Sequence, residues 1–507
     1  MPMKRRDFVK AGAALAAVPQ LKGDIPGPRP ADRLDQGPFT IEQDQGWYTI
    51  EATTPAPGPV RNFGLGLVGY TWEENGPALA VRRGETTLAQ AVEALAALPF
   101  VDVLYIRGDW RDVQSQPGRL DLQPVWDLTL DAARRHGQRV GFRVQLSNPE
   151  IQPARLAIPD FLKEKVPLVT IGASPRRPGR QFVEPRYDHP EFLRAFRELN
   201  ELLAARFDGD PLVEFVDLMM YGFWGEGHTS DLPSPFPDPA RAERTFLDMT
   251  RLQIEMWKKT PLAVNTQPDI SRVGNDAVRS LAVRSGCWLR SDSVILDEPI
   301  QIDQLANRPP WLAAVMEDGY FRHYDPAARN YAVDAAGVTV IDKTMLHALD
   351  VGANYWSLWT EAGNLARYRE GHPDAFRTLQ SRLGWRVRPA WVWQRKRTGA
   401  AELVVAFAND GVAGVPGTLR VVVETSDGKV RVGGSLDAGQ PHAGRLRQAS
   451  FILPRELEGG TVTMRAEIEV KGVRRPARWA CAQPVNADGS LSLKLKARDD
   501  PSWRKGI

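Results

Sequence analysis

The sequence predicts a (β/α)8 barrel followed by a small antiparallel β-sandwich. Between residues 61 and 388, short apolar runs of strand length alternate with amphipathic helical patterns, which is typical of a parallel sheet with crossover helices. Eight such runs occur in about 300 residues, as a (β/α)8 barrel requires. From 389 to 500 the pattern changes to closely spaced strand-like runs separated by turn residues. A doubly wound parallel sheet is the competing architecture for the first region.

The eight predicted barrel strands are short and rich in apolar residues. They occupy residues 63–70, 101–108, 139–146, 213–222, 261–266, 287–292, 311–317 and 354–359. Helical patterns lie between most of them. The pattern over 122–137 ends in basic residues and a glycine, which favours a helix C-terminus there. A longer amphipathic pattern covers 189–209.

The C-terminal region reads as a β domain. Runs such as "GTLRVVVETSDGKV" and "GTVTMRAEIEV" have strand length, and Asn-Asp-Gly and Asp-Gly turns separate neighbouring runs. Residues 384–398 connect this domain to the barrel. We expect the tryptophans of this connection to pack the two domains together: Trp385, Trp391 and Trp393.

The N-terminus predicts export. Arg5 and Arg6 precede a short Ala-rich apolar stretch, so residues 1–23 have the pattern of a twin-arginine leader. The mature protein is therefore expected in the periplasm or outside the cell. Residues 24–60, rich in Pro and Gly, are predicted to form a linker or surface wrap, with a short edge strand within 44–54.

Composition excludes several function classes. The net charge of +3 over 507 residues, without a Lys/Arg block, argues against nucleic-acid binding. Outside the leader, no apolar run reaches the length of a membrane-spanning helix. Cys287 and Cys481 form no zinc pattern, and we favour two buried free thiols over a bridge between domains. We predict neither a metal nor another cofactor. The sequence leaves the oligomeric state open.

Functional residues of a (β/α)8 barrel lie at the C-terminal ends of its strands. The residues that follow the apolar runs are largely polar or tryptophan, a combination that suits sugars because indole faces stack on the apolar faces of sugar rings and polar groups bind the hydroxyls. A carbohydrate is therefore the predicted partner. The predicted substrate-binding residues are Trp72, Arg107, Trp110, Trp224, His228, Asn265, Asp292, Trp356, Trp359 and Glu361.

Two glutamates stand out among the strand ends. Glu226 follows the fourth run and Glu317 ends the seventh. Glycoside hydrolysis needs a pair of carboxyl groups, one to protonate the leaving oxygen and one to attack or to activate water. An apolar pocket built by Phe223 and Trp224 would favour the protonated form of Glu226, and Arg107 would help to keep its partner ionised.

Two segments carry a family resemblance. Residues 103–122 and 183–228, the latter ending in "FWGEGH", resemble the retaining glycoside hydrolases of clan A. They are also similar to uncharacterised bacterial β-galactosidase-type barrel proteins with a C-terminal domain of unknown function. The resemblance implies Glu226 as acid/base and Glu317 as nucleophile. In clan A an Asn precedes the acid/base Glu, but here that position is Gly225.

That departure leaves two alternatives open. The protein could be a glycan-binding barrel that has lost its chemistry, or an inverting hydrolase that uses Asp292 as its second carboxylate. Arg107 and Arg111 also raise the option of an acidic sugar as substrate.

Overall fold

A computed structural model describes most of the chain downstream of residue 46. The described residues are 47–173, 178–227, 232–266, 276–294, 299–318, 337 and 339–503, without the side chains of 292–294, 299 and 340. The predicted leader and most of the predicted linker lie outside these ranges. So do His228 and, as a side chain, Asp292.

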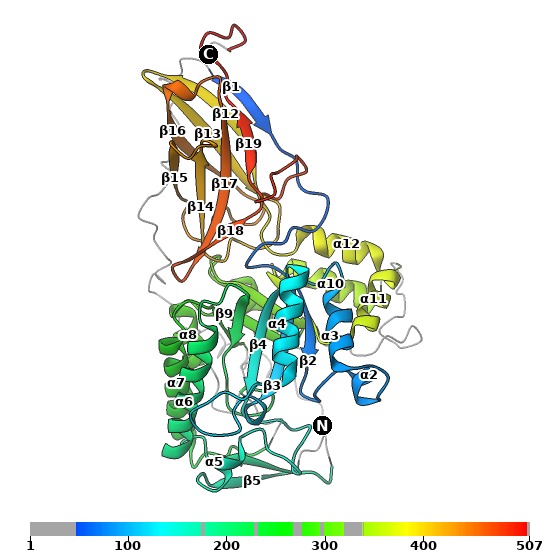
Figure 1. Ribbon diagram of the computed structural model, residues 1–507. Helices are drawn as coiled ribbons and strands as arrows, with labels where there is room; N and C mark the ends of the chain where they lie inside the picture. Colours follow the sequence, from blue (N-terminus) through cyan, green and yellow to red (C-terminus); the bar gives the residue numbers. More distant parts are fainter. Residues whose placement is uncertain are drawn as a thin grey trace, which may run out of the picture.

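Eight parallel strands form a closed barrel (Figure 1). All eight predicted runs supply one strand each, and pairing of β11 with β2 closes the circle, so the doubly wound alternative is wrong. The strands, in barrel order, are β2 (Gly66–Trp72), β3 (Val103–Asp109), β4 (Arg139–Gln145), β7 (Val213–Asp217), β8 (Leu262–Asn265), β9 (Trp288–Val294), β10 (Ala314–Asp318) and β11 (Tyr355–Leu358).

Helices surround the barrel. They are α2 (Leu79–Arg82), α3 (Leu88–Ala96), α4 (Pro124–His136), α5 (Asp160–Lys163), α6 (Pro190–Phe207), α7 (Pro239–Met256), α8 (Asp276–Arg284), α9 (Pro299–Ala306), α10 (Val340–Asp350), α11 (Ala362–Gly371) and α12 (Pro373–Arg382). Their ends follow from local chemistry. Thr87 and Gln90 form a capping box at the start of α3, and left-handed Gly137 ends α4.

The alternation of side chains along each strand divides the barrel core in two. On β3, Leu104 and Ile106 point outward into the apolar layer beneath the helices. Val103 and Tyr105 point inward and pack with Phe215 of β7. Because inward positions near the C-terminal strand ends carry polar groups instead, the barrel interior changes from apolar to charged along its axis.

A two-stranded hairpin interrupts the barrel pattern after β4. It consists of β5 (Leu168–Ala173) and β6 (Gln181–Pro185) and precedes α6. In Figure 1 it lies at the lower end of the molecule, opposite the antiparallel sheets. The sequence analysis did not predict this insertion.

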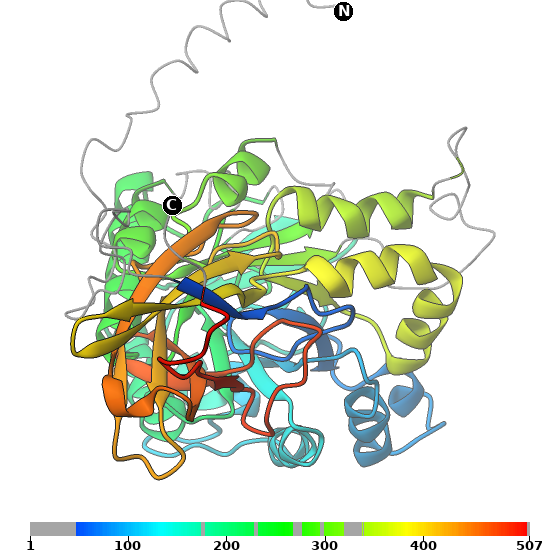
Figure 2. The same ribbon diagram turned by 90° about the horizontal axis from the view of Figure 1, so that it is seen from above.

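Two antiparallel sheets follow the barrel. One has the order β1 (Trp47–Ala52), β12 (Val387–Arg397), β13 (Ala400–Asn409) and β16 (Leu446–Pro454). The other contains β14 (Thr418–Glu424), β15 (Arg431–Ser435), β17 (Thr461–Val470), β18 (Val473–Ala477) and β19 (Leu491–Lys494). The N-terminal edge strand, β1, thus belongs to this part rather than to the barrel. Figure 2 shows these strands lying over one end of the barrel. The β-sandwich itself stays a prediction.

The connection between barrel and sheets uses one of the three predicted tryptophans. Trp385 is buried and its Nε1 donates to the Phe63 carbonyl at 2.9 Å, next to the start of β2. Trp391 and Trp393 instead stack on each other at 6.0 Å, and Trp391 is 46% exposed. The expectation that all three glue the two parts together is therefore wrong for Trp391.

The two cysteines are buried free thiols, as predicted. Burial raises the pKa of the Cys287 thiol to about 12. No helix in the described ranges is long and apolar enough to cross a membrane. Within the same ranges, no group of three or more His, Cys, Asp or Glu side chains is arranged to hold a metal ion.

Candidate active site

Glu226 sits on a glycine-rich turn after β7. Gly222, Gly225 and Gly227 have φ of +80°, +72° and +85°, and Trp224 also adopts a left-handed conformation with φ of +55°. Such values are rare for a residue with a side chain, so the turn has an unusual, defined shape. The Trp224 amide donates to the Ser147 carbonyl at 2.9 Å, which ties the turn to the end of β4. Glu226 is 2% exposed.

The structure explains why Gly225 replaces the expected Asn. A Cβ atom at this position would come within 3.1 Å of Cδ of Arg143, and the backbone is left-handed. Arg143 Nη1 donates to Oε1 of Glu226 at 2.7 Å and to the Trp224 carbonyl at 3.0 Å. An arginine from β4 thus occupies the space beside Glu226 that a side chain at position 225 would need.

Glu317 is the penultimate residue of β10, on the other side of the barrel mouth, and is 2% exposed. Its carboxylate accepts from Arg107 Nη2 at 2.9 and 3.1 Å and from the Tyr70 hydroxyl at 3.1 Å. Arg290 also donates to it. Oε2 receives all three donors, whereas Oε1 receives Arg107 alone. These donors favour the ionised form of Glu317 and leave Oε1 the less encumbered oxygen.

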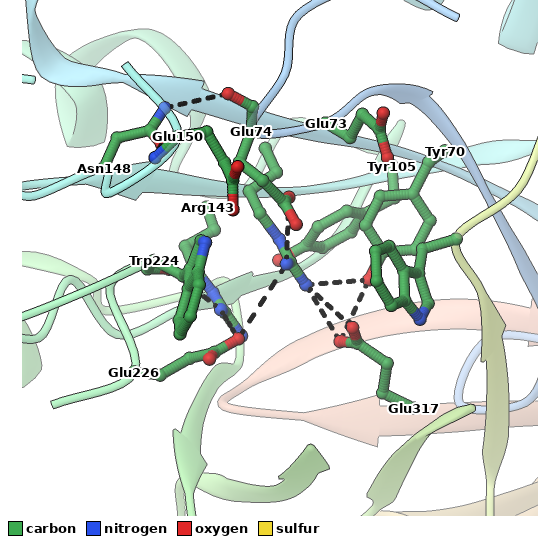
Figure 3. Close-up of polar contacts among 12 residues, drawn as sticks. Tyr70, Glu73, Glu74, Tyr105, Arg143, Asn148, Glu150, Trp224, Glu226 and Glu317 are labelled. Atoms are coloured by element: carbon green, nitrogen blue, oxygen red, sulfur yellow. Dashed lines mark hydrogen bonds and ion pairs between the residues drawn. The ribbon is translucent and has the colours of Figure 1, made fainter. Parts of the chain in front are cut away.

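One guanidinium joins the two glutamates. Arg107 Nη2 contacts Glu317, while its Nη1 lies 3.9 Å from Oε1 of Glu226 and donates to Glu74 at 3.1 Å. Figure 3 shows the carboxylates of Glu226 and Glu317 directed toward the same space. Both carboxylates therefore neighbour the same guanidinium at the barrel mouth.

Asp217 completes the charged cluster beneath the glutamates. It accepts from Arg143 at 3.0 and 3.1 Å, lies 3.3 Å from Arg290 and also accepts from Tyr105. Among the residues that the structure describes, the cluster contains four buried carboxylates and three buried arginines: Glu74, Asp217, Glu226, Glu317, Arg107, Arg143 and Arg290.

Burial and neighbouring anions act in opposite directions on these arginines. Burial opposes the charge of Arg107, but Tyr70, Glu74 and Glu226 outweigh it and leave the pKa of the guanidinium well above its ordinary value. The pKa of Arg143 and that of Arg290 are raised too, by Tyr105 and Asp217 among others, again against the effect of burial. All three arginines are therefore fixed positive charges at any pH of interest.

A pocket of about 320 Å³ opens beside this cluster, between the loops that follow β2 and β11. Tyr70, which contacts Glu317, forms part of its lining. Trp72 and Trp359 are half-buried lining residues, and Glu361 lines the pocket too. The structure thus brings together three of the predicted substrate-binding residues. Glu73 and Arg82, also in the lining, form an ion pair at 3.2 Å.

Two predicted tryptophans are in the wrong place to bind substrate. Trp110 is fully buried, packs against Phe192 of α6 at 5.6 Å and donates to Gln114. Trp356 is fully buried in the same apolar layer outside the barrel wall. Strand alternation turns Trp356 of β11 toward the helices, whereas Trp110 lies in the 3-10 turn (Trp110–Asp112) that follows β3 and packs against α6. Asn265 is buried at the end of β8, and Trp224 is half-buried beside Glu226.

The sequence analysis missed most of the charged cluster. Arg143, Asp217 and Arg290 lie inside apolar runs rather than after them. Tyr70 ends the first predicted run and Glu74 lies two residues after Trp72, but neither is among the predicted site residues. The sequence does contain a signal for these residues. A charged residue within a predicted strand, two or more residues before the end of that strand, indicates a polar barrel interior when its position faces inward.

Comparisons with known proteins return structures only. No protein-family model and no curated protein sequence matches the chain. Among solved structures, endoglycoceramidase II from Rhodococcus sp. is 14% identical, with 77% of this chain and 97% of that chain covered and a TM-score of 0.37. A β-galactosidase from Marinomonas ef1 is 14% identical, with 62% and 59% covered and a TM-score of 0.35.

A third solved structure belongs to the same broad class. It is an exo-β-1,4-mannosidase from Opitutaceae bacterium strain TAV5, 13% identical, with 65% of this chain and 57% of that chain covered and a TM-score of 0.35. All three relatives are therefore glycoside hydrolases by name. Their likeness to this chain is remote, and the assignment of function rests on the site itself.

Proposed function

We propose that the protein is a retaining glycoside hydrolase in which Glu226 is the acid/base and Glu317 the nucleophile. The observation that carries the proposal is that the two buried glutamates, from opposite sides of the barrel mouth, contact one arginine. Glycosidases of both stereochemical classes need two carboxyl groups that face each other across the scissile bond.

The two glutamates have environments that suit different roles. Three donors on Oε2 stabilise the Glu317 anion, so its Oε1 is the oxygen expected to attack the anomeric carbon. Glu226 is buried beside other carboxylates of the cluster, and a proton on it would lower the negative charge of that buried group. An ionised nucleophile and a protonated acid are the starting state of the retaining mechanism.

The reaction follows from this state in two steps. Glu226 gives its proton to the glycosidic oxygen as Glu317 Oε1 bonds to the anomeric carbon, and the leaving alcohol departs. Glu226, now a carboxylate, takes a proton from water, whose oxygen attacks the same carbon and releases Glu317. Arg107 and Arg290 neutralise Glu317 before and after the covalent intermediate, while Tyr70 holds its oxygen in place.

The pocket indicates a sugar without an acid group. Its aromatic lining, Trp72 and Trp359, suits the face of a sugar ring, and its carboxylates would accept from hydroxyls. Arg82 is paired with Glu73, and Arg107 is held by carboxylates. Arg111 contacts the Leu156 carbonyl and Asp160 instead. No arginine among these is left for a substrate carboxylate, which disfavours the acidic sugar considered above.

Aryl β- and α-glycosides of neutral sugars test the proposal. We expect turnover by the wild type and a loss of about 10²- to 10⁴-fold in Glu226→Gln and Glu317→Gln. NMR of the first-released anomer should show retention. Inversion would favour the alternative with Asp292, and an absence of turnover with retained glycan binding would favour the non-catalytic alternative.

We further propose that residues 1–23 export the protein as a twin-arginine leader. A tagged chain expressed in a bacterium with this pathway should appear in the periplasm or medium without its leader. Replacement of Arg5 and Arg6 by lysine should keep it inside the cell at full length. Export of that variant by the same route would contradict the proposal.

A further inference from the structure

A buried carboxyl group lies behind the turn that carries Glu226. Glu184 of β6, in the hairpin inserted after β4, is 0% exposed. Ser147 donates to its Oε1 and Tyr187 to its Oε2. Gln152 Nε2 donates to the Ser147 hydroxyl at 3.1 Å and lies 3.5 Å from the same carboxyl oxygen. Among the residues that the structure describes, Glu184 contacts only neutral groups.

Both direct partners of Glu184 hold the glycine-rich turn. The Tyr187 hydroxyl accepts from the Gly222 amide at 3.1 Å, and the Ser147 carbonyl accepts from the Trp224 amide at 2.9 Å. The turn is thus held at two amides, two and four residues before Glu226. The Tyr187 hydroxyl links the Gly222 amide directly to Glu184, whereas Ser147 holds the Trp224 amide with its carbonyl and contacts Glu184 with its hydroxyl. The rings of Phe182 and Phe223 lie 5.1 Å apart, so an aromatic contact also joins β6 to the turn.

We propose that Glu184 is a positioning residue that holds the Glu226 turn through Tyr187 and Ser147, and that its ionisation controls how firmly the turn is held. The expected effect on catalysis rests on the proposed function. The hydrogen bonds that hold the turn exist without a substrate and can be tested without one.

The burial of Glu184 without a cationic partner among the described residues is an unusual arrangement for a residue that only stabilises the fold. A buried carboxyl group without a cationic partner destabilises the fold when it is ionised, and an apolar residue would stabilise the fold more. Burial raises the pKa of Glu184 to about 7. The ionised form accepts from two hydroxyls at once, which fixes both of them as donors. Protonation turns one of the two carboxyl oxygens into a donor. The Ser147 or Tyr187 hydroxyl that donated to this oxygen must then reorient, and the turn is held less firmly.

The other ionisable groups around Glu184 do not titrate near neutral pH. Tyr187 has its pKa raised well above its ordinary value by burial and by Glu184 itself. The Tyr221 ring, from the β7 end, lies 5.5 Å from the Tyr187 ring. Asp188, the next acid along the chain, is paired with Arg186 and Arg241, and its pKa is lowered by these arginines despite burial. Burial also raises the pKa of Asp109 to about 7, and Asp109 accepts from Asn148 beside Ser147, so the Glu184→Gln and Asp109→Asn variants together assign a step near pH 7 to one of the two acids.

Tryptophan fluorescence of the full chain tests how the turn is held without a substrate. Trp224 lies in the turn, so its emission should change with a midpoint near pH 7. That step should be lost in Glu184→Gln and in Trp224→Phe. The control is Glu214→Gln, which removes a buried carboxylate at the opposite end of the barrel, where it accepts from the Gly64 amide and from Tyr355. This variant should keep the step. A step that persists in Glu184→Gln overturns the inference.

Steady-state kinetics then distinguish a role of Glu184 in positioning Glu226 from a role in folding alone. In Glu184→Gln we expect kcat to fall about 10-fold at pH 8 with KM changed less than twofold, and the acid limb of the kcat profile to shift below pH 7. Tyr187→Phe should also lower kcat, and it provides the test if Glu184→Gln does not fold. An unchanged acid limb in a folded variant contradicts the proposal. A fluorescence step in a protein that hydrolyses no glycoside would instead overturn the proposed function alone.

Discussion

The side chain of Arg143 packs closely against the left-handed backbone of Gly225. A Cβ atom at Gly225 would lie 3.1 Å from Arg143 Cδ, and the same arginine donates to Glu226 at 2.7 Å. The missing Asn is therefore not evidence of lost chemistry. Within the described cluster, Arg143 is the side chain that donates to the acid/base candidate from β4.

Restoring the clan A residue should damage the site. We expect Gly225→Asn to lower kcat at least about 10-fold, because Arg143 must move away from Glu226 and Asp217 to make room. Gly137→Asn is the matched control: Gly137 also has a left-handed backbone, but nothing lies within 4 Å of its added Cβ. Kinetics with an aryl glycoside check the pair. A more active Gly225→Asn variant would show that the arginine is dispensable.

Arg107 should be sensitive even to a conservative change. A lysine keeps the charge but cannot contact Glu74, Glu226 and Glu317 at once, since the ammonium lacks the planar fork. We expect Arg107→Lys to lower kcat about 10²- to 10³-fold. Arg111→Lys, four positions on and held by the Leu156 carbonyl, should stay within about twofold. Equal effects of the two changes would argue against a role for Arg107 in catalysis.

The pocket predicts a binding role for Trp359. Removing its ring should raise KM about 3- to 10-fold with a smaller effect on kcat, because stacking on a sugar face contributes about 0.5–1.5 kcal/mol. Trp391→Ala removes an exposed indole from the antiparallel sheet and should leave both constants unchanged. Steady-state kinetics on a glycoside with a neutral sugar decide the matter. An unchanged KM in Trp359→Ala would place the sugar elsewhere.

The free thiols should be inert in the folded protein. Burial raises the pKa of Cys287 to about 12 and that of Cys481 above its ordinary value, so almost no thiolate is present at neutral pH. We expect an aromatic disulfide reagent to react with neither thiol in the native protein and with both after unfolding in urea. A reducing agent should leave Tm unchanged. If neither thiol reacts after unfolding, Cys287 and Cys481 form a disulfide.

The sequence predicted the barrel well because its strands are short apolar runs at regular spacing. It also placed Glu226 and Glu317, since both follow their runs. It failed for Trp356, which alternation along β11 turns outward, and for Trp110, which a 3-10 turn after β3 packs into the same apolar layer. The inward residues Arg143 and Arg290 sit within their runs, and Glu184 reaches the site through an inserted hairpin. Such contacts depend on tertiary pairing, which no local pattern records.

Asp109 should make the folded state sensitive to pH. This acid ends β3, is 5% exposed and accepts from Asn148 at 3.0 and 3.2 Å. Burial, with a smaller contribution from Asp112, raises its pKa from 3.8 to about 7. Between these values the folded chain keeps a proton that the unfolded chain has lost. The stabilisation that this proton represents is complete below about pH 4 and disappears as pH rises through about 7.

Asp109→Asn removes this titration while it keeps the shape and an acceptor for Asn148. Relative to the wild type, the variant should therefore gain free energy of unfolding between pH 4 and pH 8, by up to about 4 kcal/mol for a three-unit difference in pKa. Urea unfolding at both pH values measures the gain. Asp131→Asn, an exposed acid on α4 paired with Arg134, is the control and should show little change. If the difference between Asp109→Asn and the wild type is the same at both pH values, Asp109 titrates normally in the folded protein and its burial carries no such cost.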